Sequence, residues 1–106
     1  MSLLDTVVLP KLNGSYEVVV KSYQEITNKD GGYILVIFQF PDREYKFCLF
    51  PKRVDYFCSC LKKQFGVEDK TTLRELLDTA KETPITVFIE WSDEYNGYNL
   101  AFHEMQ

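Results

Sequence analysis

Residues 33–40 (YILVIFQF) constrain the fold more than any other part of the sequence. This segment is apolar on both of its alternating faces, which predicts a strand that is covered on both sides. Alternating segments flank it at residues 15–23 (SYEVVVKSY) and 43–50 (REYKFCLF). Turn-forming residues separate the three segments, within residues 24–32 and at Pro41 and Asp42. The sequence therefore predicts three antiparallel strands in a meander.

Two helices are predicted after the third strand. Residues 54–65 have apolar side chains at helical spacing and are followed by Gly66, which suits a helix C-cap. Residues 72–81 begin with Thr72 and Glu75, the pattern of a capping box. An apolar stripe of Leu73, Leu76, Leu77 and Ala80 follows in the same segment, before Thr83 and Pro84 end it.

A second hairpin is predicted after the helices. Residues 85–92 alternate between apolar and polar side chains, which predicts a fourth strand. Asn96-Gly97 is a strong signal for a two-residue turn, so residues 98–103 are expected to return as the fifth strand. Tyr95 and Tyr98 would then flank the turn.

The predicted element order is β-β-β-α-α-β-β, which is a mainly β fold with a helical insertion. We expect a single domain over residues 1–106, in which residues 1–12 are a lead-in segment. The order, the loop NKDGG and the aromatic hairpin WSDEYNGYNLAF resemble small OB-fold proteins, in particular compact single-stranded-DNA-binding and replication proteins of bacteriophages and other mobile elements. The resemblance covers about residues 13–104 and implies a five-stranded OB-like Greek-key barrel. Bacterial single-stranded-DNA-binding proteins usually carry a long disordered tail that ends in an acidic, phenylalanine-tipped peptide, which recruits partners. This sequence ends instead in His103, Glu104, Met105 and Gln106, which argues against a partner-recruiting role.

Aromatic content and charge distribution indicate the class of ligand. Eight Phe, seven Tyr and one Trp make up 15% of the chain. The net charge is −4, but residues 1–65 hold nine Lys and Arg against seven acids, whereas residues 66–106 hold three against nine. We therefore expect a mildly basic face on an acidic molecule. Aromatic faces combined with cations are typical of single-stranded nucleic-acid binding.

In OB barrels the ligand lies on the second and third strands and on the loops after the first and fourth strands. Mapped onto this chain, that cleft gives a candidate nucleic-acid-binding set of Lys29, Tyr33, Arg43, Tyr45, Tyr95 and Tyr98. A one-residue error in alternation exchanges the two faces of a strand. In that case Lys46 and Phe38 replace Tyr45 and Tyr33. Asp93 and Glu94 lie in the last turn and would repel phosphates, so the predicted affinity is modest and salt-dependent.

Other functions are less favoured by the residues. The single histidine, His103, and the lack of phosphate-loop, G-x-S-x-G or H-E-x-x-H motifs argue against an enzyme, and we expect no cofactor. Cys48, Cys58 and Cys60 are expected to be unpaired thiols without zinc, in a reducing compartment. No secretory signal or membrane-length apolar run is visible, so a cytoplasmic protein is expected.

The ligand class has one alternative. An acidic domain with exposed tyrosines is also suited to a protein-interaction or inhibitor module of a mobile element, which would bind a protein partner or self-associate. Single-stranded nucleic acid, with DNA favoured over RNA, is the first prediction.

Overall fold

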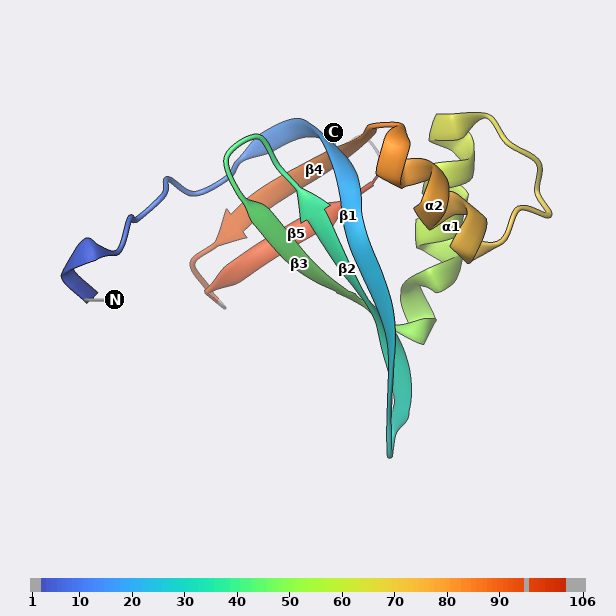
Figure 1. The fold of residues 1–106 in the computed structure, drawn as a ribbon, viewed down its shortest axis with the longest axis horizontal. Coiled ribbons are helices and arrows are strands. Elements are labelled where there is room, and N and C mark those ends of the chain that lie inside the picture. Colours follow the sequence, from blue (N-terminus) through green and yellow to red (C-terminus); the bar gives the residue numbers. More distant parts are fainter. Residues whose placement is uncertain (1–2, 95, 103–106) are drawn as a thin grey trace.

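The computed structural model describes residues 3–94 and 96–102 and contains one five-stranded sheet and two α-helices (Figure 1). The predicted order of strands and helices is confirmed. In chain order the elements are a short 3-10 helix η1 (Leu3–Asp5), β1 (Gly14–Asn28), β2 (Gly31–Gln39), β3 (Glu44–Leu49), α1 (Pro51–Phe65), α2 (Leu73–Glu82), β4 (Ile85–Ser92) and β5 (Gly97–Ala101).

The sheet has the strand order β3-β2-β1-β4-β5, and every neighbouring pair is antiparallel. The long strand β1 is shared between two halves of the sheet. Residues 14–18 pair with β4, and residues 19–28 pair with β2. The register shifts between Val20 and Ser22, which is the irregularity expected where a strand bends and changes partner. The pairing of the first and fourth strands, which the OB-like order requires, is present.

The sheet is not closed into the predicted barrel. Within the described residues β3 and β5 are the two edges of the sheet and form no strand pairing with each other. Side chains contact each other across this boundary: the ring centroids of Tyr45 and Tyr98 lie 5.8 Å apart, and those of Phe47 and of Phe102, which follows β5, lie 5.5 Å apart. Closure of a barrel depends on strand tilt and stagger, which the order of elements does not specify. We call this boundary between β3 and β5 the seam.

The hairpin of β1 and β2 is longer than predicted. Residues 24–32 were expected to form a loop, but pairing continues to Asn28 and Gly31, so only residues 29 and 30 remain in the turn. The Asn28 side chain accepts a hydrogen bond from the backbone N–H of Asp30 at 3.0 Å, and Gly31 has a φ of +122°, a value that L side chains rarely adopt. The hairpin consequently projects beyond the rest of the sheet (Figure 1).

Local sequence signals explain both helices. Helix α1 begins at Pro51, three residues earlier than predicted, because proline suits the first helical position; it ends at Gly66, which has a φ of +66°. Helix α2 begins with the predicted capping box, in which the Thr72 hydroxyl accepts a hydrogen bond from the Glu75 N–H. No helix of the described residues is long and apolar enough to span a membrane.

The core lies between the helices and one face of the sheet. Phe57, Leu61, Leu76, Leu77 and Ala80 are the buried helical residues. Alternate residues of the strands complete the core, which also contains Val18, Val20, Val36, Phe38, Phe40, Phe47, Leu49, Ile85, Val87, Ile89, Leu100 and Phe102.

The last hairpin differs from the prediction at its turn. Ser92 pairs with Gly97 and Trp91 pairs with Tyr98, so Gly97 belongs to β5 and the connection is residues 93–96. Asn96 has a φ of 53°, as expected for a turn residue. Tyr95 and His103 lie outside the described residues.

Candidate nucleic-acid interface

Five aromatic residues pack against each other at the seam. The Tyr98 ring lies 4.9 Å from Trp91 and 5.8 Å from Tyr45, centroid to centroid and edge to face. Tyr45 also contacts Phe40 at 6.1 Å, and Phe40 contacts Tyr16 at 5.6 Å. Such pairs stabilise a fold by about 0.5–1.5 kcal/mol each beyond their burial. This seam cluster therefore contributes to packing.

Part of the lead-in segment covers the seam cluster. The Leu12 N–H donates a hydrogen bond to the Tyr98 hydroxyl at 3.1 Å, and the Leu12 side chain is buried. The Lys11 ammonium lies 3.7 Å from the centroid of the Trp91 ring, which is a cation–π contact. Within this cluster, the Trp91 ring and the Tyr98 hydroxyl are thus already engaged by the same chain.

Arg43 is held by two partners beside the seam. Its guanidinium donates to the Asp42 carboxylate through Nε and Nη2, at 3.0 Å each, and to the Pro10 carbonyl at 2.7 Å. The guanidinium holds the pKa of Asp42 below its ordinary value, mainly through these hydrogen bonds. The positive charge of Arg43 is therefore balanced locally by Asp42.

A different surface, the outer face, remains accessible on β2 and β3. It consists of Tyr33, Leu35, Ile37, Lys46, Cys48 and Phe50. The register pairs Leu35 with Cys48 and Ile37 with Lys46, and the Tyr33 and Phe50 rings contact each other at 5.5 Å. Phe50 is 48% exposed, and Lys46 is also exposed. The outer face thus combines one exposed and one half-buried aromatic ring with a cation.

Cations near the outer face differ in their partners. Lys29 is exposed at the tip of the β1–β2 hairpin, and neither Lys29 nor Lys46 forms an ion pair with any described residue. Lys21 forms an ion pair with Glu44 at the start of β3. The uncompensated positive charge of this surface therefore comes from Lys29 and Lys46.

The structure does not bring the predicted site residues together. Lys29 lies at the hairpin tip and Tyr33 on the outer face, whereas Arg43, Tyr45 and Tyr98 surround the seam. Tyr95 lies outside the described residues.

Neither predicted assignment of faces describes the sheet. The register pairs even-numbered residues of β2 with odd-numbered residues of β3, so Phe38 faces the core together with Tyr45. Tyr33 shares the outer face with Lys46. The prediction had paired Tyr33 with Tyr45, or Phe38 with Lys46, because it fixed the relative register by alternation alone.

Sequence reasoning also missed Phe50 as a surface aromatic. It was not among the predicted site residues, yet it continues the alternation of Lys46 and Cys48 directly after β3. Its alternation with those two residues was the available signal. It is also the N-cap residue of α1, where it is followed by Pro51.

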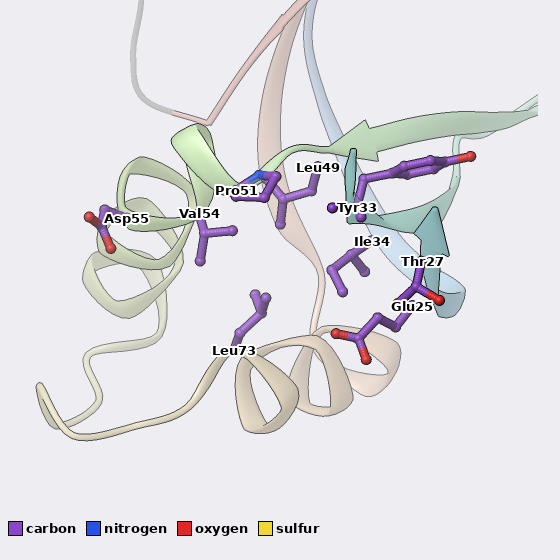
Figure 2. A pocket seen from close by; sticks show the side chains of 11 residues that line it. Glu25, Thr27, Tyr33, Ile34, Leu49, Pro51, Val54, Asp55 and Leu73 are labelled. Atoms are coloured by element: carbon purple, nitrogen blue, oxygen red, sulfur yellow. The ribbon is translucent and has the colours of Figure 1, made fainter. Parts of the chain in front are cut away.

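An apolar groove of about 560 Å³ lies between the β1–β2 hairpin and the starts of α1 and α2. Figure 2 shows Ile34, Val54 and Leu73 pointing toward one another from three elements, while the Tyr33 ring points away. Leu49 and Pro51 complete the apolar wall. We call this feature the groove.

Two carboxylates, Glu25 and Asp55, line the rim of the groove, and the residues that line it include no Lys or Arg. Neither carboxylate forms an ion pair within residues 3–94 and 96–102. The groove therefore suits apolar groups that bring no negative charge.

The three cysteines are free thiols, as predicted. Cys48 is exposed, whereas burial raises the pKa of Cys58 and of Cys60. In the described part of the chain, no group of three or more His, Cys, Asp or Glu side chains is arranged to hold a metal ion.

No protein-family model matches the chain, and no curated protein is significantly similar to it.

Proposed function

We propose that this domain binds single-stranded nucleic acid on the outer face of β2 and β3. The observation that carries the proposal is the contact between half-buried Tyr33 and exposed Phe50 on the same face as Lys46, whose charge no described residue balances. Stacking of one base on such a ring stabilises the complex by about 1–3 kcal/mol, and a cation on the same surface binds the phosphates.

The fold supports the same surface. The strand order β3-β2-β1-β4-β5, with helices between β3 and β4, is compatible with a partly open OB-like barrel. In that class of fold, oligonucleotides bind across the second and third strands and the loop between the first two strands. In this chain these elements carry Tyr33, Lys46 and Lys29, and Phe50 directly follows β3.

Two uncompensated lysines predict weak electrostatic binding. Each phosphate contact on a single strand contributes about −0.7 to the slope of log K against log salt, so Lys29 and Lys46 together predict a slope of about −1.4. The net charge of −4 further limits the affinity.

The proposal is tested by fluorescence anisotropy of a labelled oligothymidylate at several salt concentrations. Phe50→Ala is expected to weaken binding by about 1–3 kcal/mol through the loss of one stacking ring. Lys46→Gln is expected to make the salt slope shallower by about 0.7. Lys70→Gln is the matched control. It removes the same charge as Lys46→Gln, but from an exposed position in the connection between the helices.

Each variant is first checked for an unchanged unfolding midpoint. Binding that is undetectable at low salt and high protein concentration contradicts the proposal. It is also contradicted if Phe50→Ala and Lys46→Gln bind as tightly as Lys70→Gln.

A protein-interaction module is the second candidate function. The exposed apolar residues of the lead-in segment favour it, because Leu3, Val7 and Val8 are 91%, 78% and 89% exposed. Contiguous exposed apolar side chains are typical of protein-binding surfaces.

A further inference from the structure

We propose that residues 3–9, the arm, dock in the groove of a second copy of this chain, so that two copies exchange arms. This inference deepens the second candidate function and does not rest on nucleic-acid binding. It joins two apolar features that the structure leaves separate: an exposed segment and a groove that no described side chain fills.

The arm has the composition of a buried strand but is exposed. Val7, Val8 and Leu9 follow one another, and they are 78%, 89% and 39% exposed. Residues 6–10 belong to neither a helix nor a strand. Their β-branched and apolar side chains favour an extended conformation packed against a surface. The arm therefore has apolar area that docking would remove from water.

The groove offers a complementary apolar surface. Ile34, Leu49, Val54 and Leu73 line it, and its volume of about 560 Å³ is enough for several side chains. The arm contains one carboxylate, Asp5, but the run from Val7 to Leu9 carries no charge, so this part of the arm can enter without placing a carboxylate against Glu25 or Asp55. Complementarity of this kind resembles the apolar anchors of peptide-recognition grooves.

The position of the arm favours docking between copies. Arg43 holds Pro10 beside the start of β3, whereas the groove lies at the opposite end of β3, next to Leu49. Figure 1 shows the arm running away from the sheet at the end opposite the helices. The 3-10 turn of residues 3–5 and the four following residues in an extended conformation together span about 19 Å, which is sufficient to reach a neighbouring molecule. Two equivalent contacts around a two-fold axis would form a closed dimer.

The experiment measures the mass of the full chain by light scattering and sedimentation over a wide range of concentrations. The wild type is expected to be in monomer–dimer equilibrium. A double change in the arm, Val7→Asp with Val8→Asp, and a separate change in the groove, Val54→Lys, are each expected to raise the dimer dissociation constant at least tenfold. Val67→Asp is the matched control, since Val67 is 38% exposed in the connection after α1.

Mixing the variants provides a second test. The arm variant retains its groove and the Val54→Lys variant retains its arm, so the mixture can form one intact contact and is expected to yield a heterodimer. Lys46→Gln is expected to leave the dimer unchanged, which separates this test from that of nucleic-acid binding.

Several results would overturn the inference. A wild type that is monomeric at every concentration excludes arm exchange. If the arm change leaves the dimer dissociation constant unaltered, another surface joins the copies. The same conclusion follows if Val54→Lys changes this constant no more than Val67→Asp does. The circular-dichroism spectrum of each variant is compared with that of the wild type. If either variant is not folded, Leu73→Gln in the groove and Val8→Ser in the arm replace it, and the same outcomes apply.

Discussion

The Tyr98 hydroxyl accepts a hydrogen bond from the Leu12 N–H at 3.1 Å, although the two residues are 86 positions apart in the chain. Tyr98 lies on β5 at one edge of the sheet. From the opposite edge, Arg43 donates to the Pro10 carbonyl at 2.7 Å. The lead-in segment is thus held from both sides of the seam. It connects two edges that no strand pairing joins in the described residues.

The first prediction concerns this hydrogen bond. Tyr98→Phe keeps the ring but removes the acceptor of the partly buried Leu12 N–H, so the free energy of unfolding is expected to fall by about 1 kcal/mol. Urea unfolding measures the change. Tyr33→Phe is the control, because the Tyr33 hydroxyl forms no hydrogen bond within the described residues and its removal should leave the stability unchanged. Equal effects of the two changes would contradict the assigned role of Leu12.

The second prediction concerns the aromatic core. Phe102 is 2% exposed, and its ring lies 4.8 Å from Phe57, 5.5 Å from Phe47 and 5.8 Å from Phe38. Phe102→Ala removes a buried ring at the centre of this set and is expected to cost about 3–5 kcal/mol, measured by urea or thermal unfolding. Phe50→Ala, at a side chain that is 48% exposed, serves as the control and should cost much less. A small effect at Phe102 would show that the core tolerates its loss.

Local patterns were sufficient to predict the elements. Alternation identified the strands, Gly66 the end of α1, and Thr72 with Glu75 the start of α2. These signals act within a few residues, so they can be recognised without knowing the fold. The errors at the β1–β2 hairpin and at Gly97 are errors of turn length, which strand pairing decides.

The candidate site could not be predicted in the same way. Whether Tyr33 shares a face with Tyr45 or with Lys46 depends on the register between β2 and β3, and a shift of one residue reverses it. The engagement of Tyr98 and Arg43 depends on the lead-in segment, whose position is determined by contacts distant in sequence. The aromatic content was correctly noticed, but tertiary packing decides which rings remain accessible.

The third prediction concerns the pH dependence of Asp42. Hydrogen bonds from Arg43 lower the pKa of Asp42 in the folded state. The Asp42–Arg43 pair therefore stabilises the fold fully at pH values above the pKa of Asp42 in the unfolded state. This stabilisation is lost as the pH falls through the lower pKa of Asp42 in the folded state. An NMR titration of the Asp42 carboxyl carbon is expected to give a pKa below the ordinary value. Arg43→Gln should move it upward, whereas Lys46→Gln should not. An unchanged Asp42 titration in Arg43→Gln would show that the pair is not formed in solution.

The last prediction concerns the three thiols. The thiolate is the reactive form of cysteine, and burial raises the pKa of Cys58 and Cys60, so less of each is ionised near neutral pH. Cys48 is exposed on the outer face. Limited alkylation with iodoacetamide at about pH 8, close to the ordinary pKa of a thiol, is therefore expected to modify Cys48 first, as mapped by mass spectrometry of peptides. In urea the three rates should converge, because unfolding removes the burial that distinguishes them. Faster modification of Cys58 or Cys60 in the folded protein would mean that α1 is more open than its packing indicates.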